Sequence, residues 1–505
     1  MAAAGTVALF LTLVLRFWHP VYGFTRFLQM DAASANNSIK ELHGLPLYVY
    51  RDRGNYDGIW YCQIAYHPLL DDSEFNSVID NLGYRARRIL LPALAWTLAA
   101  GREPWIFQIY SALNIGVWLA MAGLFWRILS VDSARSFAVW FGFLFSVGAM
   151  ECVRHAMTDL LATALIAAAL MAFEAGRGAT GWLGAAGLTK ETSLLSLPAV
   201  FTRPMLSGSN LRKTLIAALP LFLWLAYVRW RTGPGNPGLS NFTVPPFGYL
   251  QKWHDSISAF QTERDTLLVA VSLLAVFGLT VQAVYIALQP SRSDPWWRLG
   301  AVHALLMMFL GGLVWKDFPG AAPRVLLPMA LAFNVLARRR NAAWVWILAG
   351  NLTVFAGLNC MRAVDRNDPR EFASTRSGSV AALVRLEDGW FGLEHKSRHR
   401  WSWSGGTARV QFETWPKSRC MLRFSFVVHS LVPQTVHVRQ EAVELWQGSV
   451  GSADTRATLD FPVKDGQALL VFSSDGPAVP ESADRGARSL AFRIYDPKIE
   501  IVGRY

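Results

Sequence analysis

The stretch Asn55–Tyr61 places one carboxylate, that of Asp57, between aromatic side chains inside a long polar segment. A carboxylate held in this way could accept a proton from a hydroxyl group, as a general base does. Tyr56 and Tyr61 flank Asp57, and their rings could stack on a bound sugar. An aspartate followed by a glycine is also a common turn former, so this stretch alone leaves both interpretations open.

Three arginines, Arg85, Arg87 and Arg88, follow immediately before an apolar stretch. Guanidinium groups bind phosphate oxygens through paired hydrogen bonds, so we expect these arginines to hold a phosphate headgroup. The alternative is that they extend toward lipid headgroups and only anchor the chain at a membrane surface. Arg324, which precedes another apolar stretch, has the same two interpretations.

Other charged residues interrupt the apolar stretches. Arg154, His155 and Asp159 lie at the head of one stretch, and Lys190 and Glu191 lie within another. A charge inside a membrane costs on the order of a few kcal/mol unless it is paired or hydrated, so such charges usually mark a cavity. We expect these residues to bind substrate, and structural ion pairs are the alternative.

Eleven apolar stretches lie between Thr6 and Met361. Hydrophobic residues make up 52% of the chain and charged residues 17%, and the charges lie mainly outside the apolar stretches. Because about 20 apolar residues cross a bilayer core of roughly 30 Å, this pattern excludes a soluble fold. It predicts an α-helical polytopic membrane protein with about 11 transmembrane helices. The clearest predicted spans are 105–129, 135–150, 156–173, 215–230, 266–288, 299–315, 325–337 and 342–358.

The distribution of basic residues predicts the orientation of the spans. Segments 203–213 and 338–340 are rich in Lys and Arg, which places both in the cytoplasm. Counting spans from them places the loops 25–87 and 231–265 on the outer face. The stretches 89–100 and 181–201 are short or interrupted, so the topology of residues 89–201 stays open. The net charge of +12 reflects these clusters, and we expect no nucleic-acid partner.

Residues 362–505 follow a different pattern. Short segments rich in Val, Phe and Leu alternate in polarity and are separated by turn residues, which predicts an antiparallel β-sandwich. The tryptophans of this region could form a carbohydrate-binding surface or could fill the core and the turns. They are Trp390, Trp401, Trp403, Trp415 and Trp446.

The order of these features resembles the GT-C superfamily of membrane glycosyltransferases. Residues 56–65 and 84–92 are similar to the bacterial branch related to the mannosyltransferases of GPI-anchor assembly, and Gly187–Thr192 is similar to a short motif of the superfamily. The resemblance covers about residues 1–361. It implies a polyprenyl-phosphate-linked hexose as donor, Asp57 as base, and helices around a cavity at the membrane. Many relatives carry paired acids where this chain has a single Asp, so a divalent metal stays possible.

The expected function is therefore transfer of a mannose-like hexose to a glycan, lipid or protein acceptor on the outer face. The composition favours a bacterial inner membrane, with the C-terminal domain in the periplasm. A transporter or flippase of lipid-linked glycans is one alternative, but it should show repeated halves. A non-catalytic protein of cell-envelope assembly is another, but it would not need so many spans.

Overall fold

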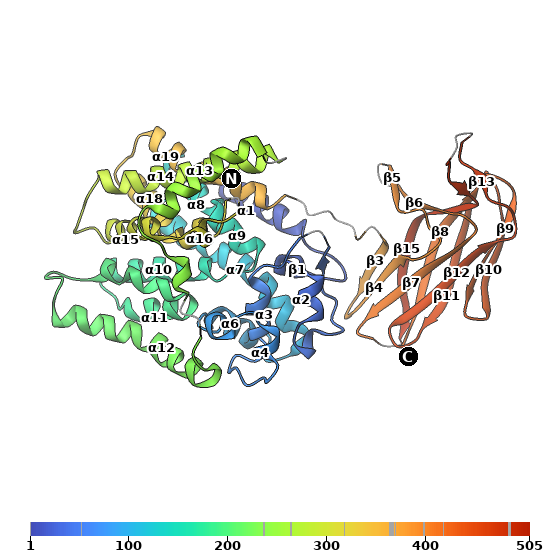
Figure 1. Cartoon of the computed structure of the whole chain (residues 1–505), viewed down its shortest axis with the longest axis horizontal. Helices are drawn as coiled ribbons and strands as arrows, with labels where there is room; N and C mark the ends of the chain where they lie inside the picture. Colours follow the sequence, from blue (N-terminus) through green and yellow to red (C-terminus); the bar gives the residue numbers. More distant parts are fainter. Residues whose placement is uncertain are drawn as a thin grey trace. The chain divides into compact units, whose positions relative to one another are not determined.

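The structure is a computed structural model. It describes residues 2–51, 53–235, 238–262, 265–317, 319–362, 368, 370–396, 399–417, 419–482 and 486–504. Internal contacts divide the chain into two units: Met1–Trp18 with Phe24–Arg362, and His19–Gly23 with Ala363–Tyr505. The first unit is built mainly from helices and the second from strands (Figure 1).

The helical unit begins with α1 (Ala2–Leu15), which is followed by a polar segment of short elements and then by the longer helices. The polar segment contains η1 (Thr25–Leu28), β1 (Met30–Asp31), α2 (Ala32–Asn36), η2 (Lys40–Leu42), β2 (Val49–Tyr50), α3 (Gly58–Ile64), α4 (Phe75–Val78) and α5 (Leu82–Arg85). The next elements are α6 (Leu90–Leu98), α7 (Glu103–Leu129), α8 (Ala134–Leu144), α9 (Val147–Arg154), α10 (Asp159–Glu174), α11 (Thr180–Thr189), η3 (Glu191–Val200) and α12 (Gly208–Thr232). The last are η4 (Leu239–Asn241), α13 (Phe247–Thr262), α14 (Thr266–Leu288), α15 (Pro295–Phe309), α16 (Gly312–Trp315), α17 (Ala322–Val325), α18 (Leu327–Arg339), α19 (Trp344–Gly350) and α20 (Thr353–Cys360).

Within the described residues, three helices are long and apolar enough to cross a membrane: α7, α12 and α14. The bent pair α8 and α9, which turns by 41°, makes a fourth span if it is counted as one. The other predicted spans are also helical, but their helices are shorter. For example, α10 has 16 residues, which rise only about 24 Å at 1.5 Å per residue. Helix length and composition therefore give three or four spans and do not show eleven.

The surface of α12 indicates what surrounds this unit. Only 17% of its most apolar window is buried, although the helix is 25 residues long. An apolar surface of this extent is unusual on a soluble monomer and fits contact with lipid tails. The large apolar side chains it exposes include Leu211, Leu215, Ile216, Leu219, Phe222, Leu223 and Trp230.

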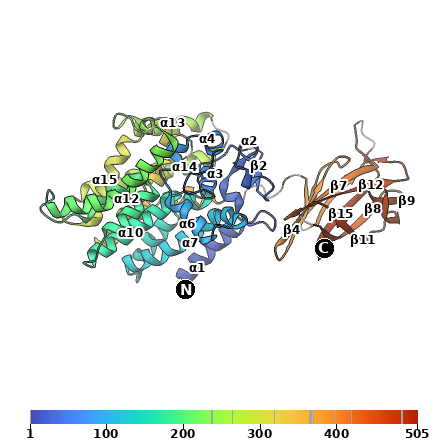
Figure 2. The same cartoon turned by 90° about the horizontal axis from the view of Figure 1, so that it is seen from below.

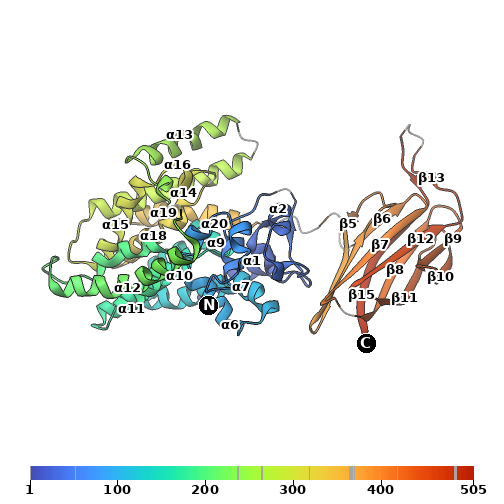
Figure 3. The ribbon, with the colours of Figure 1, turned by 60° about the horizontal axis from the view of Figure 1, so that its bottom comes forward.

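Packing around α18 and α7 positions the rest of the helical unit. Every residue of α18 from Leu327 to Ala337 is buried, so this helix lies at the centre of the unit. The Trp118 ring of α7 stacks on Phe10 of α1 with 3.7 Å between ring centroids. Helix α6 lies beside α7 (Figure 2), and α11 lies beside α12 (Figure 3).

Helix α3 is buried over its whole length, from Gly58 to Ile64. The sequence favours an amphipathic interfacial helix over Cys62–Leu70, and this expectation is wrong: the helix begins earlier and has no solvent-exposed face. Gly58 explains the close packing at its start. A Cβ atom there would lie 2.2 Å from the carbonyl oxygen of His155, so no other residue fits without a backbone shift.

The strand unit contains two antiparallel sheets that share one core. The six-stranded sheet has the order β10-β9-β12-β7-β4-β3, and the five-stranded sheet has the order β11-β8-β15-β6-β5. Phe412 and Phe424, one from each sheet, meet at 5.1 Å between ring centroids. The strands are β3 (Glu371–Ser377), β4 (Val380–Leu386), β5 (Glu394–Lys396), β6 (His399–Ser404), β7 (Thr407–Trp415), β8 (Cys420–Ser430), β9 (Gln434–Gln440), β10 (Val443–Val450), β11 (Thr455–Val463), β12 (Gln467–Ser474), β13 (Val479–Pro480), β14 (Ser489–Leu490) and β15 (Phe492–Arg504).

The predicted antiparallel sheet region is confirmed, and its alternation is regular. Strand β8 alternates buried and half-buried residues along all of its 11 positions, as a strand with one face on a core must. None of the five tryptophans is fully exposed. Trp390 and Trp446 pack against the core, and Trp403 is 7% exposed. These positions agree with the core interpretation of the tryptophans.

The segment His19–Gly23 is packed within the strand unit. His19 Nε2 lies 2.8 Å from Glu371 Oε1 on β3, and both side chains are buried. Arg385 on β4 donates to the Tyr22 hydroxyl at 3.0 Å. Burial raises the pKa of Tyr22 to about 12, although the Arg385 charge opposes this shift. The unit therefore depends on a piece of chain that lies far from it in sequence.

Candidate functional site

A cavity of about 560 Å³ in the helical unit has a charged part and an apolar part in its wall. Its ionisable side chains are Asp57, Asp80, Tyr84, Arg85, Arg87, Arg88, Lys190, Glu191 and Arg324. Its large apolar side chains are Phe242, Leu306, Leu310, Leu313, Val314 and Val325. The fold thus brings together residues that are up to 268 positions apart in the chain (57 to 325).

Asp57 is the acidic group that leads into α3. Its backbone is already helical, and its side chain caps no backbone N–H of α3. The carboxylate, 36% exposed, instead lies 2.9 Å from the guanidinium of Arg85. Arg85 also donates two hydrogen bonds to Asp80, at 3.0 and 2.7 Å. One arginine is therefore held between two carboxylates, and Asp57 keeps oxygen atoms accessible from the cavity.

Burial alone would lower the pKa of Arg85, but its hydrogen bond with Asp80 and the charge of Asp57 raise the pKa above its ordinary value. The guanidinium therefore stays charged at any pH at which the protein is folded. Its charge is balanced by two neighbouring carboxylates, which fixes the geometry at this edge of the cavity.

Arg88 is buried and forms one wall of the cavity. It donates to the hydroxyl groups of Tyr61 at 2.6 Å and of Tyr84 at 2.9 Å. It also forms an ion pair with Glu191 at 3.2 Å. Tyr84 in turn accepts a hydrogen bond from Asn241 at 3.2 Å. This network joins the polar segment to the 190–192 and 238–242 segments, which the sequence separates widely.

A second network lies around Arg324 of α17. Lys190 forms a buried ion pair with Asp159 at the start of α10. Asp159 also lies 3.4 Å from Arg324, and Arg324 lies 3.6 Å from Glu151 of α9. Buried charges are tolerated when they are paired in this way, and removing one partner leaves a costly unpaired charge. Lys190 is both ion-paired and a lining residue of the cavity, so substrate binding and a structural ion pair do not exclude each other for this residue. Arg324 is likewise ion-paired and lines the cavity.

The two tyrosines beside Asp57 lie away from the cavity surface. The Tyr56 ring stacks on His155 at 3.9 Å, and its hydroxyl accepts from Arg324 at 3.0 Å. Tyr61 is fully buried against Arg88. Burial raises the pKa of both hydroxyl groups, although the arginines oppose this shift. Both tyrosines contact arginines and neither is among the described lining residues of the cavity, and their stacking on a sugar stays a prediction.

Arg154 also lies outside the cavity. It donates to the carbonyl oxygen of Arg26 at 3.1 Å and to the Tyr50 hydroxyl at 3.2 Å. Its guanidinium lies over the Phe17 ring at 4.9 Å. These hydrogen bonds hold the start of the polar segment, and Arg154 is not among the described residues that line the cavity, so its contact with substrate stays a prediction.

Some of the predicted site residues line the cavity, and others do not. In the wall lie Asp57, Arg85, Arg87, Arg88, Lys190, Glu191 and Arg324. The described residues that line the cavity do not include Tyr56, Tyr61, Arg154, His155 or Asp159.

Sequence reasoning missed several residues of the site. Asp80 carries no local signal of a site, although its spacing to Arg85 allows the observed pairing. Tyr84 stands inside the motif-like stretch 84–92 but has no assigned role there. Asn241 and Glu151 carry no local signal that would single them out.

An apolar groove continues from the cavity. It has a volume of about 600 Å³ and shares Glu191, Thr192, Phe242 and Leu306 with the cavity. The wall on this side is held by backbone hydrogen bonds, from Thr243 to Phe309 at 2.9 Å and from Gly311 to Asn241 at 2.8 Å. Its remaining lining residues are Leu194, Leu195, Val302, Leu305 and Phe309.

The second long loop contributes to the cavity with one end only. Residues 238–242 lie in the wall, and the rest of the described loop is mainly α13. Lys252 of α13 is buried and donates to the carbonyl oxygen of Asp317. His254 is exposed at the surface, which fits the interpretation of a surface histidine.

Comparison with protein-family models finds no match, and comparison with curated proteins finds none either.

Proposed function

We propose that the chain is an integral membrane glycosyltransferase that moves a mannose-like hexose from a polyprenyl-phosphate donor to an acceptor hydroxyl group. The observation that supports it is that a cavity with an accessible carboxylate and several cations opens into an apolar groove. A donor of this class has matching parts: a sugar, a phosphate and a hydrocarbon chain.

Asp57 is the general base in this proposal. The acceptor hydroxyl must lose a proton as it attacks the sugar, and a positioned carboxylate can take it. The side chain of Asp57 is more exposed than that of the buried Asp159, which is 2% exposed and held by Lys190 and Arg324. Of these two aspartates, Asp57 is the one that an acceptor can reach.

The departing phosphate needs positive charge close to it. We assign this role to Arg87, which lines the cavity with its guanidinium 5.5 Å from the Tyr84 ring centroid. Arg88 uses its donors on Tyr61, Tyr84 and Glu191, so it is assigned to the wall and to the local field. Arg324, which belongs to the network with Asp159 and Glu151, also lines the cavity and adds positive charge to its wall.

The hydrocarbon chain of the donor occupies the apolar groove in this proposal. The groove is lined by Leu194, Leu195 and Leu305, and it begins where Phe242 and Leu306 end the cavity. An apolar chain placed there loses contact with water, while the phosphate stays among the arginines. This arrangement fixes the direction in which the donor enters.

The ends of the helices support the proposed orientation. Arg338 pairs with Asp132 at 3.0 Å, and Arg339 pairs with Glu174 at 2.6 Å. The ends of α7, α10 and α18 therefore meet on one side, and the cluster of arginines there favours the cytoplasm. The polar segment meets the far end of α12, where Arg231 donates to the carbonyl oxygen of Leu70 at 2.8 Å. This favours an outer location for the cavity.

This orientation also leads us to propose the number of spans, the membrane and the location of residues 362–505. The shorter helices complete about 11 spans together with α7, α12 and α14. The membrane is a bacterial inner membrane, and residues 362–505 lie in the periplasm. The acceptor is a glycan, a lipid or a protein, and a divalent metal is a possible addition to the reaction.

The test is to incubate purified protein in detergent with polyprenyl-phosphate mannose, polyprenyl-phosphate glucose and, as a control, a nucleotide-linked mannose. We expect release of polyprenyl phosphate from a lipid-linked donor, and we expect the nucleotide-linked mannose to stay uncleaved, with no nucleoside diphosphate released. If no lipid-linked sugar is cleaved while labelled lipid moves between the leaflets of liposomes, the chain is a flippase and the proposal is wrong.

A further inference from the structure

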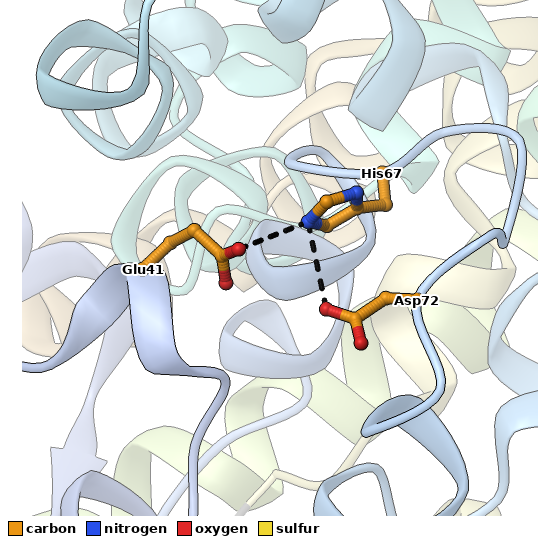
Figure 4. A group of neighbouring side chains, drawn as sticks. All are labelled: Glu41, His67 and Asp72. Atoms are coloured by element: carbon orange, nitrogen blue, oxygen red, sulfur yellow. Dashed lines mark hydrogen bonds and ion pairs between the residues drawn. The ribbon is translucent and has the colours of Figure 1, made fainter.

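Three side chains of the polar segment converge outside the cavity. Glu41 comes from η2, His67 follows α3, and Asp72 lies five residues further along. Figure 4 shows the imidazole of His67 facing both carboxylates. Its Nε2 atom lies 3.3 Å from Glu41 Oε1 and 3.5 Å from Asp72 Oδ2. One ligand atom from each residue lies within 4.8 Å of the others.

The carboxylates of Glu41 and Asp72 are buried. The side chains of Glu41 and Asp72 are only 9% and 5% exposed. Among the described residues Glu41 Oε2 is buried with no hydrogen-bond partner, and Asp72 Oδ2 is buried with no contact other than the long one, 3.5 Å, to His67 Nε2. The sequence favours a solvated surface for the polar run 71–74, which is wrong for Asp72, because the turn after His67 folds its side chain inward. A buried carboxylate oxygen without a partner is costly unless a cation occupies the space next to it.

The distances fit a small divalent ion. Bonds of about 2.1 Å from a tetrahedral metal to nitrogen and oxygen place neighbouring ligand atoms about 3.4 Å apart. The two distances from His67 Nε2, 3.3 and 3.5 Å, lie on either side of this value. One imidazole and two carboxylates leave a fourth position for water. An imidazole ligand favours Zn²⁺ or a similar transition metal over Mg²⁺ and Ca²⁺.

Asp71 lies beside the other nitrogen of the His67 ring. Its Oδ1 lies 3.4 Å from His67 Nδ1, the ring nitrogen that faces away from the other two carboxylates. Histidines that bind metals usually donate their second ring N–H to a carboxylate or a carbonyl group, which fixes the tautomer and the ring orientation. Three carboxylates thus surround one imidazole, so even a charged histidine would leave excess negative charge at the cluster.

We propose that Glu41, His67 and Asp72 bind one divalent transition-metal ion of the Zn²⁺ type. The ion ties η2 to the turn at His67–Asp72. The carbonyl oxygens of Leu69 and Leu70 in this turn accept hydrogen bonds from Tyr227 and Arg231 of α12. The metal therefore fastens the polar segment where it meets α12. None of the three ligands is among the described residues that line the cavity, so the site is independent of the proposed transfer reaction.

The experiment measures metal binding and stability of the full chain in detergent. After removal of metal with EDTA, Zn²⁺ is titrated against a chromophoric chelator, and bound metal is counted by mass spectrometry. We expect about one ion per chain, and a rise in the thermal unfolding midpoint on Zn²⁺ addition. His67→Gln and Asp72→Asn should lose the stoichiometric ion. His43→Gln, an exposed histidine of the same segment, should bind as the wild type does.

Asp71→Asn distinguishes a metal site from a plain ion pair. It keeps all three ligands and removes the charge behind the ring, so the affinity for Zn²⁺ should fall about 10- to 100-fold without loss of the site. If the wild type binds no more Zn²⁺ than His67→Gln and its unfolding midpoint does not respond to Zn²⁺ or EDTA, the cluster is a histidine–carboxylate ion pair and the proposal fails. This wild-type measurement decides even if the ligand variants do not fold.

Discussion

Replacing Asp57 with Asn is expected to abolish most of the transfer activity while leaving the fold intact. Asparagine keeps the shape of the side chain but cannot accept a proton at neutral pH. Loss of a general base costs about 100- to 10,000-fold in rate. Binding of the donor should survive, because the phosphate is held by arginines and the amide can still form hydrogen bonds.

The structure separates this effect from a loss of stability. The change removes one ion pair, between Asp57 and Arg85 at 2.9 Å, and the Asp57 side chain is 36% exposed. An ion pair with this exposure contributes at most about 1 kcal/mol. The expected rate loss corresponds to about 2.7 to 5.5 kcal/mol in the activation barrier. The expected increase in the activation barrier is therefore larger than the expected loss of stability. Arg85 also keeps its ion pair with Asp80 in the variant.

Asp80→Asn is the matched control because it changes the other carboxylate on the same arginine. Asp80 accepts two hydrogen bonds from Arg85, so its loss disturbs Arg85 at least as much as the loss of Asp57. If Asp57 only positions Arg85, the two variants should lose similar activity. If Asp57 is the base, Asp80→Asn should lose less than about tenfold, far below the general-base range.

The assay follows release of polyprenyl phosphate from polyprenyl-phosphate mannose, so it does not require the natural acceptor. Asp31→Asn serves as a second control, since Asp31 caps α2 through Ser34 and asparagine caps equally well. Asp52, a further acidic residue of the segment, lies outside the described residues. Nearly full activity in Asp57→Asn would refute the assignment of the base. Full activity in every one of these variants would remove the main support for the transferase mechanism.

Three further predictions concern the donor, the strand unit and pH. Arg87→Gln should weaken binding of polyprenyl-phosphate mannose by about 1.5 to 3 kcal/mol, measured by equilibrium binding in detergent. Arg88→Gln should lower the thermal unfolding midpoint, since it leaves Glu191 without its cation; unchanged donor affinity in Arg87→Gln would refute the assignment of Arg87 to the phosphate. Truncation after Asp365, a residue outside the described ones, should leave a membrane-inserted protein with some donor hydrolysis, and failure to insert or fold would show that residues 366–505 are structural. Burial lowers the pKa of Lys252 to about 8, so the unfolded chain holds one more proton than the folded chain between that pKa and the unfolded value of about 10.4. The unfolding midpoint of the wild type should therefore rise relative to that of Lys252→Met from pH 8 to pH 10, and parallel curves would contradict this.

The strand unit shows how far a local pattern determines structure. The predicted segment 421–429 lies within β8 and the segment 457–461 within β11, because alternation of apolar and polar residues fixes which face is buried. The pairing of β8 with both β11 and β15 has no such local signal, since β15 lies more than 60 residues later. Sheet order depends on which edges meet during packing.

The helices show where hydropathy stops being informative. It located α7, α12 and α14 correctly. It also gave a single span for 342–358, where the structure has the separate helices α19 and α20. Hydropathy averages over a window and does not register the turn at Asn351 and Leu352, an interruption within the apolar helical stretch Trp344–Cys360. The count of spans is therefore less certain from sequence than the presence of apolar helices.

For the candidate site, the sequence by itself determined which side chains could do chemistry, because an acid in a polar loop and arginines before an apolar stretch are unusual local choices. Only the tertiary structure decided their roles. Tyr61 and Arg154 are buried by neighbouring segments and hold other groups in place through hydrogen bonds. Asp80 belongs to the site because it shares Arg85 with Asp57. Whether a charged side chain faces a cavity or a partner depends on segments a hundred or more residues away, such as Glu191 against Arg88. Such distances are set by the packing of whole helices, which no local pattern encodes.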